Sequence, residues 1–234
     1  PLYQQAYVVA KNSGCYILAR DIKKLNGTQR AFAIYNPNDT AQRVQVSFSD
    51  LCLAGKVSLR DLFLKKDLGQ FSGTYTVTVP AHGTRIYKDQ GERRLERTRH
   101  EAETADISDY QELTNNQAAK TGIYEYADYC SSGLKAGWLG QSESNDLQWR
   151  DVYSHKGGKY ELTIAYISGE NRTMAVDVNG RRVQTISVSS GSCNTVAKKT
   201  VSIQLKKGHN TIRLSNATGW MPDIDYIDVR PVFQ

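Results

Sequence analysis

The sequence predicts an all-β protein made of two tandem antiparallel β-sandwich domains. Apolar and polar residues alternate over short runs, turn residues separate these runs, and no helical 3.6-residue periodicity persists. Charged residues at 91–98 interrupt the alternation and divide the 234 residues into two parts, each long enough to bury a core. We therefore predict domains at 1–90 and 99–234, joined by a charged linker at 91–98.

The first part contains five well-alternating runs, which we predict as strands. They are residues 30–35, 42–48, 56–61, 73–79 and 83–87. Between them, 36–39 and 80–83 are rich in Asn, Asp, Pro and Gly, the residues that tight turns require. Closely spaced short strands with such turns favour a sandwich over a βαβ fold.

The second part repeats this pattern with different residues. Its predicted strands are 159–167, 173–178, 181–188, 200–205 and 211–215. Asn179-Gly180 separates two alternating runs and predicts a hairpin in which both turn residues have positive φ. The sequence KKGH at 206–209 predicts a second hairpin.

The charge distribution argues against a nucleic-acid partner. Residues 1–99 hold 16 Lys and Arg against 8 Asp and Glu, whereas residues 100–234 hold 14 against 16. Much of the basic excess lies in 88–99, which has no aromatic residue for stacking on bases, so we assign it to a solvated linker or an interdomain surface. No apolar run approaches the roughly 18 residues of a membrane span, so we expect no membrane insertion.

Four cysteines, Cys15, Cys52, Cys130 and Cys193, fall two in each part. None forms a CxxC motif or lies near a histidine at zinc spacing, which argues against a zinc site. One disulfide in each part and four free thiols are both consistent with this arrangement, and the sequence does not choose between them.

Motifs in the first part resemble glycoside hydrolase family 27, the retaining α-galactosidases and their relatives. They are PLYQQ at 1–5, FAIYN at 32–36, SDL at 49–51, VSLRDL at 57–62 and VPAHGT at 79–84. In that family a proline-leucine-x-x-glutamine segment leaves the catalytic (β/α)8 barrel, and an antiparallel β-domain follows. The resemblance implies that residues 1–90 are this β-domain, that the catalytic barrel lies upstream, and that this chain alone is not an enzyme.

Motifs of the second part resemble a carbohydrate-binding module of family 35 or the related family 6 over residues 99–232. They are HEAE at 100–103, DVNG at 177–180, NTIRLSN at 210–216 and DIDYIDV at 223–229. The resemblance implies a jelly roll of two antiparallel sheets, a structural calcium ion, and sugar binding in loops at one end of the sandwich.

By this resemblance the calcium ligands are Glu101, Glu103 and Asp225, with backbone carbonyls from the loop near 121–123. Calcium binds six to eight oxygens, so clustered carboxylates suit it. Glu101 and Glu103 are expected on an opening strand with their side chains on one side, and Asp225 on a last strand that lies near it. The alternative is that Glu101 and Glu103 are ordinary solvent-facing residues.

A sugar site needs aromatic rings for the C–H faces and polar side chains for the hydroxyls. By the resemblance an aromatic platform lies in 126–133, Asp223 takes the place of a sugar-binding Asn, and Trp220 precedes it. The candidate sugar-binding residues are Tyr126, Tyr129, Trp138, Asn194, Trp220 and Asp223. For Trp138 and Trp149 a core position is the alternative.

Two departures from the families narrow the ligand. Family 6 modules commonly carry tryptophans near 193–196, where this sequence has Cys-Asn-Thr-Val, and Asp223 replaces the usual Asn. A site with one aromatic wall and a carboxylate favours family 35 and galactose-like terminal sugars.

We therefore expect the non-catalytic C-terminal region of a secreted, periplasmic or extracellular α-galactosidase. It would pack on the missing barrel and bind galactose-containing glycans through a calcium-stabilised module. Asp223 and Asp225 could bring two carboxylates about 7 Å apart, but any DxD on a strand does this, so it is weak evidence for catalysis. The alternatives are β-domains that have lost sugar binding, and a lectin-like adhesion fragment acting alone.

Overall fold

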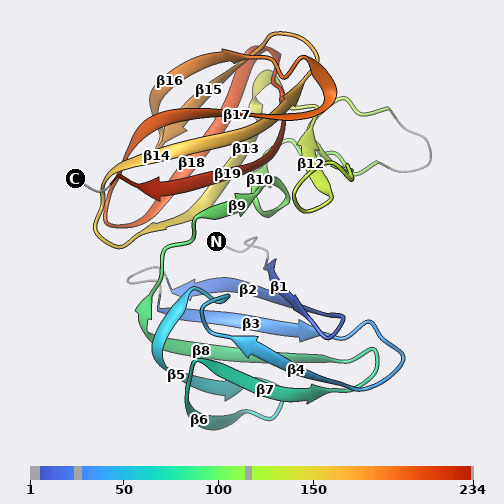
Figure 1. Cartoon of the computed structure of the whole chain (residues 1–234), viewed down its shortest axis with the longest axis vertical. Coiled ribbons are helices and arrows are strands. Elements are labelled where there is room, and N and C mark those ends of the chain that lie inside the picture. The colour runs from blue at the N-terminus through green and yellow to red at the C-terminus, as the bar shows by residue number, and fades with distance from the viewer. Residues whose placement is uncertain (1–5, 24–27, 114–117, 233–234) are drawn as a thin grey trace. The chain divides into compact units, whose positions relative to one another are not determined.

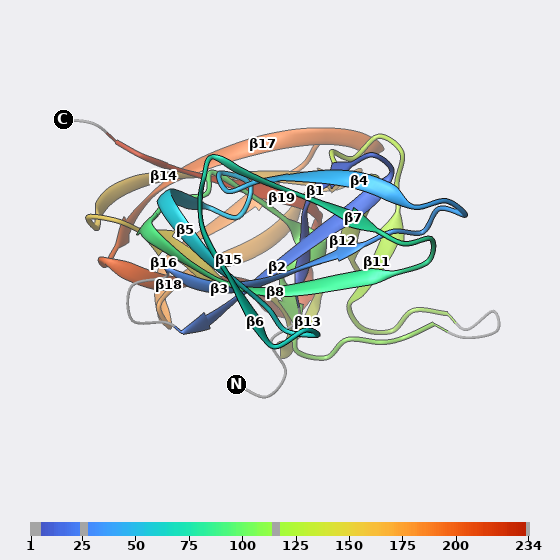
Figure 2. The same cartoon turned by 90° about the horizontal axis from the view of Figure 1, so that it is seen from below.

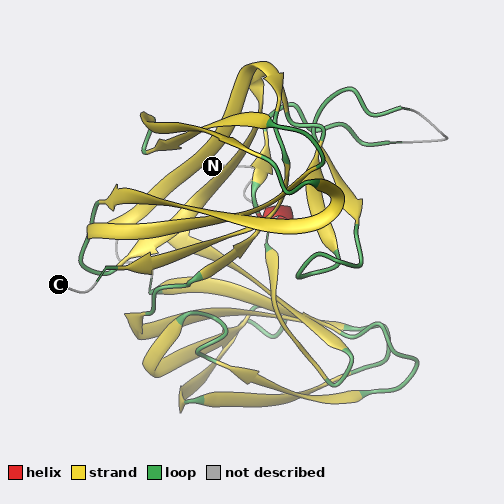
Figure 3. Ribbon diagram, turned by 45° about the horizontal axis from the view of Figure 1, so that its top comes forward, coloured by secondary structure: helices red, strands yellow, loops and turns green. Residues whose placement is uncertain are grey.

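The computed structural model describes residues 6–23, 28–113 and 118–232, and it is built almost entirely of antiparallel strands (Figures 1 and 3). The helical structure of the described residues is one turn of 3-10 helix, η1 (Ala102–Thr104). The chain divides into two compact units, Pro1–Glu96 and Arg97–Gln234. The predicted class, tandem antiparallel β-sandwiches, is confirmed. The PLYQQ motif at 1–5 lies outside the described residues.

The first unit has two layers of strands. Its strands are β1 (Tyr7–Asn12), β2 (Cys15–Lys23), β3 (Gln29–Tyr35), β4 (Gln42–Ser47), β5 (Leu53–Asp61), β6 (Lys66–Ser72), β7 (Thr74–Val79) and β8 (Thr84–Arg94). One sheet has the order β1-β2-β3-β8-β5-β6, and β4 pairs with β7 in the other (Figure 2). Phe32, Val57 and Tyr87 of the large sheet pack with Val44 and Val46 of β4 in one buried cluster.

The predicted turns at 36–39 and 80–83 are confirmed, and a buried asparagine joins them. The Asn36 Nδ2 atom donates to the carbonyls of Thr40 at 2.9 Å, Val79 at 3.1 Å and Pro80 at 2.9 Å. Because a buried amide must be hydrogen-bonded, these bonds fix the two turns against each other.

The charged stretch predicted as a linker at 91–98 is partly strand. The strand β8 runs to Arg94 and pairs with β5, with Leu53 opposite Arg94. Gly91 and Arg94 are buried, whereas Glu92 and Arg93 are exposed, so the paired strand continues through these charges. Charged side chains on an exposed face are compatible with a strand, which is why composition alone placed the end of β8 too early.

The second unit is a jelly roll of two sheets. Its strands are β9 (Arg99–Glu101), β10 (Asp106–Ile107), β11 (Ile123–Tyr126), β12 (Leu134–Gly137), β13 (Gly140–Ser154), β14 (Gly158–Ser168), β15 (Arg172–Val178), β16 (Arg181–Val188), β17 (Ser192–Leu205), β18 (Gly208–Trp220) and β19 (Asp223–Pro231). One sheet has the order β10-β13-β18-β15-β16 and the other β11-β12-β19-β14-β17, with β9 also on β19. Leu147, Val176 and Leu214 of the first sheet pack with Leu162 and Ile227 of the second.

The hairpin predicted at Asn179-Gly180 is confirmed. It joins β15 to β16, with Val178 opposite Arg181, and φ is 52° at Asn179 and 79° at Gly180. A two-residue turn with both φ values positive matches the twist of the flanking strands, so the local sequence suffices to specify it.

The hairpin predicted at 206–209 is wrong. The strand β17 before this turn pairs with β14 in one sheet, whereas β18 after it pairs with β13 and β15 in the other. The turn therefore crosses between the sheets. The buried Asn210 closes it by donating from Nδ2 to the carbonyls of Lys206 at 2.8 Å and Gly208 at 3.0 Å.

All four cysteines are free thiols, and all four lie in the described part of the chain. Cys15, Cys52 and Cys130 are buried, whereas Cys193 is exposed. Of the two arrangements that the sequence left open, the structure has the free thiols.

Candidate functional site

Three charged side chains meet at one end of the sheet formed by β11, β12 and β19. The Nζ atom of Lys135 contacts the carboxylate of Asp223 and lies 3.3 Å from Oε2 of Glu125. We call Glu125, Lys135 and Asp223 the charged trio. Strand pairing assembles it: Glu125 lies opposite Lys135, and Ala136 opposite Ile224 brings Asp223 alongside.

A glycine in β12 leaves room for the two carboxylates of the trio. A methyl group at Gly137 would come within 2.6 Å of Oε2 of Glu125 and 3.2 Å of Oδ1 of Asp223. A contact of 2.6 Å is too short for a real side chain, so Gly137 allows both acids to approach this strand.

Burial and pairing oppose each other in the electrostatics of the trio. Burial raises the pKa of Asp223, the hydrogen bond and charge of Lys135 lower it, and the charge of Glu125 raises it again. For Lys135, burial lowers the pKa, but its bond to Asp223 and the charge of Glu125 outweigh this, so its pKa lies above the usual value. Lys135 therefore stays protonated between two acids.

Two tryptophans border the trio. The ring centroids of Trp138 and Trp220 are 5.6 Å apart and the planes cross at 88°. The indole Nε1 of Trp138 donates to Oε1 of Glu125 at 3.4 Å, and this Trp is 43% exposed. Trp149, by contrast, is buried in the core and donates to the carbonyl of Glu101 at 3.0 Å. Of the two tryptophans that the sequence left open, Trp138 faces solvent.

Tyr129 lies in the turn after β11, and Asn194 lies near the start of strand β17. The Tyr129 hydroxyl donates to the carbonyl of Cys193 at 3.1 Å, which ties the turn after β11 to the start of β17. The interaction of Tyr129 with Lys135 raises the pKa of that lysine further. Asn194 is exposed, and its backbone N–H donates to Oγ of Ser192 at 3.1 Å. This region thus holds one tyrosine ring, and positions 193–196 supply no second aromatic wall.

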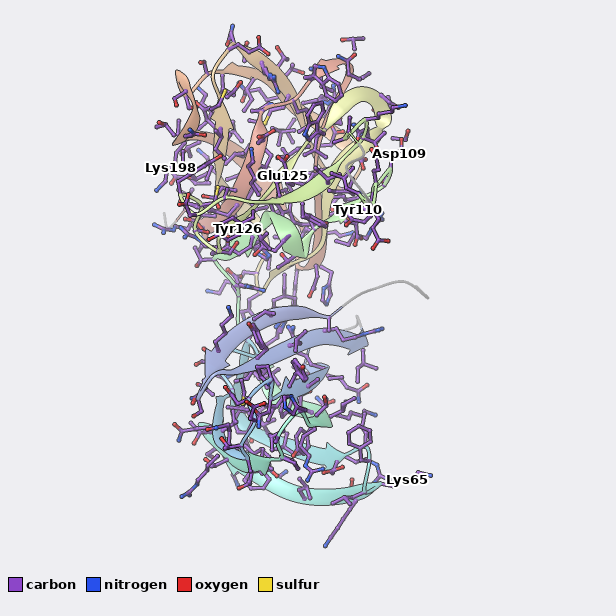
Figure 4. The ribbon with its side chains drawn as sticks, turned by 90° about the vertical axis from the view of Figure 1, so that its right-hand side faces the viewer. Lys65, Asp109, Tyr110, Glu125, Tyr126 and Lys198 are labelled. Carbon is purple, nitrogen blue, oxygen red and sulfur yellow. The ribbon has the colours of Figure 1, made fainter. Side chains whose placement is uncertain are left out.

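Tyr126 ends the strand that carries Glu125 (Figure 4). Its side chain is 82% exposed, the most exposed of the large hydrophobic side chains of the described residues. Of the predicted sugar-binding residues, the structure puts Asp223 in the trio, with Trp138 and Trp220 in contact beside it. Tyr129 lies in the adjoining turn, Asn194 in β17, and Tyr126 is exposed at the end of β11.

Glu125 and Lys135 did not emerge from the sequence as site residues. Each lies in a short strand, β11 or β12, that the alternation pattern did not reveal. The available signal was the acid between two tyrosines at 124–126, which becomes informative only once Lys135 is known to lie opposite it.

One of the three predicted calcium ligands lies in a different element from the one expected. Glu101 ends β9, which pairs with β19 as predicted, and Tyr226 is its partner. Glu103 is not on that strand but in the 3-10 turn η1. The opening strand is only three residues long, so the expectation that Glu101 and Glu103 share one strand face is wrong.

Ser131 already bridges two of these acids. Its hydroxyl donates to Oε2 of Glu101 at 2.5 Å, and its backbone N–H donates to Oδ1 of Asp225 at 3.0 Å. The Oε2 atom of Glu103 is buried without a hydrogen-bond partner. Burial raises the pKa of Glu101, and the charges of Glu103 and Asp225 raise it further, so the three acids act on one another.

These acids fit calcium in donor chemistry, because hard carboxylate oxygens and one unsatisfied buried oxygen are what such a cation neutralises. Their arrangement is less favourable: the described residues hold no group of three or more His, Cys, Asp or Glu side chains set around a common point. The carbonyl of Gly122, in the loop expected to add ligands, accepts from the Gln111 N–H at 2.9 Å.

Two family models match the chain one after the other. The C-terminal β-sandwich domain of α-galactosidases matches residues 22–89, and carbohydrate-binding module family 35 matches residues 110–232, more than half of the 234 residues. The chain belongs to carbohydrate-binding module family 35. The two matches together identify a carbohydrate-active protein whose described units are a β-sandwich of the α-galactosidase type and a family 35 module.

Solved structures agree with this fold. A family 35 module from Clostridium thermocellum is 24% identical, with a TM-score of 0.51 over 57% of this chain and 98% of that one. Isomalto-dextranase of Arthrobacter globiformis T6, solved with panose, is 19% identical, with a TM-score of 0.55 over 91% of this chain. The present chain spans 36% of that enzyme. A search of curated proteins gave no match. Among the described residues no helix has the length and apolar character needed to cross a membrane.

Proposed function

We propose that the family 35 module binds galactose-containing glycans and thereby holds a parent enzyme on its substrate. The observation that carries the proposal is the right-angled pair Trp138 and Trp220 beside the acids Glu125 and Asp223. A sugar presents C–H faces to aromatic rings and hydroxyl groups to hydrogen-bond acceptors. An exposed indole and two partly exposed carboxylates supply both kinds of contact in one place.

The same geometry supports weak binding. Asn194 is exposed, and positions 193–196 hold no aromatic residue that could form a second wall. Few sugar hydroxyls are then removed from water, so each molecule is held loosely. A loosely binding module still serves an enzyme to which it is tethered, because it raises the effective concentration of substrate around the catalytic domain.

The first unit would join this module to the catalytic part. We propose that it packs on the (β/α)8 barrel of a retaining α-galactosidase-type parent, secreted, periplasmic or otherwise extracellular. The match to the α-galactosidase C-terminal domain supports this, as does the turn after β5, where Leu62, Phe63 and Leu64 are all exposed. Neighbouring exposed apolar side chains favour contact with another surface.

Calcium is proposed as a structural ion of the module, held by Glu101, Glu103 and Asp225. The buried, unpartnered Oε2 of Glu103 supports this, since a cation would compensate it. If calcium binds there, a chelator lowers the unfolding temperature of the native chain. In a Glu103→Gln variant, which lacks that charge, the chelator has a smaller effect.

Calorimetric or NMR-detected titration of galactose and α-galactosides tests the sugar proposal. We expect binding by the native chain and binding about tenfold weaker or more in Asp223→Ala and Trp138→Ala. Tyr35→Ala, which removes an exposed ring from the first unit, is the matched control and leaves binding unchanged. Unchanged affinity in both module variants would place the sugar elsewhere.

The second candidate is a module that keeps the fold without binding sugar. The absent second aromatic wall at 193–196 and the engagement of Lys135 by two acids favour it. Absence of binding to galactosides and to a broad panel of other glycans, by a chain that unfolds cooperatively, would establish this alternative.

A further inference from the structure

We infer that the charged trio makes this module select uncharged sugars and reject sugar acids, with Glu125 as a residue that sets this specificity. The inference rests on the proposed function, and it names the chemical class of its ligand. Lys135 meets two carboxylates at once, so the trio holds two acids and one base. A sugar carboxylate placed beside it would face an excess of negative charge.

No cation of this cluster is left over to receive a sugar carboxylate. The Nζ of Lys135 is already in contact with Asp223 and 3.3 Å from Glu125, and its side chain is only 14% exposed. The nearby Arg172, whose charge lowers the pKa of Asp223, is engaged as well. Its Nε donates to Oε1 of Glu170 at 2.8 Å and an Nη donates to the carbonyl of Met221 at 3.1 Å.

Glu125 is placed to act on a ligand as well as on Lys135. Its side chain is 31% exposed, so it can be reached from the solvent. One oxygen accepts from the indole of Trp138 at 3.4 Å, and the other lies over Gly137, where a methyl group would be 2.6 Å away. A sugar stacked on Trp138 therefore has the Glu125 carboxylate beside it, as an acceptor for hydroxyl groups and a repelling charge for an acid.

The size of the effect follows from Coulomb's law. Partly buried sites have an effective dielectric constant of about 20. At that value, repulsion between two like charges about 6 Å apart weakens binding of a charged ligand by roughly two orders of magnitude relative to a neutral one. Salt and solvent access reduce this, so we expect a discrimination of at least about tenfold at low ionic strength. The discrimination should shrink as salt is added.

Matched sugar pairs test the inference. Galactose is compared with galacturonate, and glucose with glucuronate, because each pair differs only at C6. The four sugars are titrated into the full chain at pH 7 and low salt, with NMR detection. We expect the neutral member of the bound pair to bind at least tenfold more tightly. In Glu125→Gln the ratio should fall to about threefold or less, mainly because the sugar acid binds better.

Glu161→Gln is the matched control, since it removes one exposed acid from β14 of the same sheet, away from the trio. It should leave the affinity ratio unchanged. The unfolding temperature of Glu125→Gln should also stay unchanged if Glu125 acts on the ligand rather than on the fold. Equal or tighter binding of a sugar acid by the native chain would overturn the inference, and so would an unchanged ratio in Glu125→Gln. Failure of all four sugars and of the α-galactosides to bind would instead remove the proposed function, and the inference with it.

Discussion

Each unit contains a cluster of acids and bases, and the two clusters differ in where they lie. In the first unit Asp89 lies opposite Arg30 on paired strands β8 and β3, and both side chains are completely buried. In the second unit the charged trio lies at the rim of the jelly roll beside two tryptophans, and its acids are 20% and 31% exposed. The same residue types are thus enclosed in one unit and open to solvent in the other.

The difference decides what each cluster can do. Neither carboxylate oxygen of Asp89 has a hydrogen-bond partner, and burial raises its pKa to about 7, although the charges of Arg30 and Arg94 oppose the rise. Such a group affects stability and cannot meet a ligand. The trio keeps its charges paired yet accessible, which is the condition for recognising a ligand. Charge content alone would not distinguish the two.

The largest expected effect is the pH dependence of stability that Asp89 gives to the first unit. The folded state holds the Asp89 proton up to about pH 7, whereas the unfolded state loses it near 4. The folded state therefore binds more protons in between, so this group stabilises the first unit as the pH falls from 8 to 4, by up to about 4 kcal/mol. Hydrogen exchange of β3 and β8 amides would measure this. In Asp89→Asn the dependence should be lost, and an equal dependence in both proteins would contradict the assignment.

The second prediction concerns the stability of the trio. Lys135→Ala leaves Glu125 and Asp223 facing each other without their shared cation, so we expect a loss of about 2–3 kcal/mol in the unfolding free energy of the second unit. Chemical denaturation followed by hydrogen exchange of β14 amides reports it. Lys159→Ala, which removes an exposed lysine from β14, serves as control and should change stability by less than about 0.5 kcal/mol. Similar losses in both variants would mean that the trio contributes little.

The third prediction concerns sugar binding at the rim. Trp138→Ala removes an exposed ring, so the affinity for the bound sugar should fall about tenfold, or about 1.4 kcal/mol, while the unfolding temperature changes little. Titration together with thermal unfolding separates these effects. A drop in unfolding temperature with unchanged affinity would make Trp138 part of the fold rather than of the site.

The smallest expected effect lies at the open side of the site. Asn194 is exposed and donates to Ser192 through its backbone N–H, which a substitution of the side chain retains, so Asn194→Ala should change the affinity less than threefold. A tenfold loss would show that a sugar extends across to β17. In that case the site would have two walls, and the contrast with the enclosed cluster of the first unit would be sharper.

The sequence by itself determined the class of the fold and its local turns. Alternation with a period of two assigns residues to faces of a sheet, and Asn179-Gly180 has a backbone preference strong enough to make a hairpin unaided. Family resemblance brought in Trp220 and Asp223 as candidates, and the structure places Asp223 in the charged trio and Trp220 against Trp138.

Only the tertiary structure decided which strands are partners. The alternation pattern did not predict the 15-residue strand β13, because several register shifts along it break the alternation. The turn at 206–209 has the residues of a hairpin but crosses between sheets, since nothing in a turn specifies where the next strand pairs. Glu125 and Lys135 likewise form a site only because strands β11 and β12 pair and set them opposite each other. A residue's side chain and face are local properties, whereas its neighbour across the sheet is fixed by the packing of the whole domain.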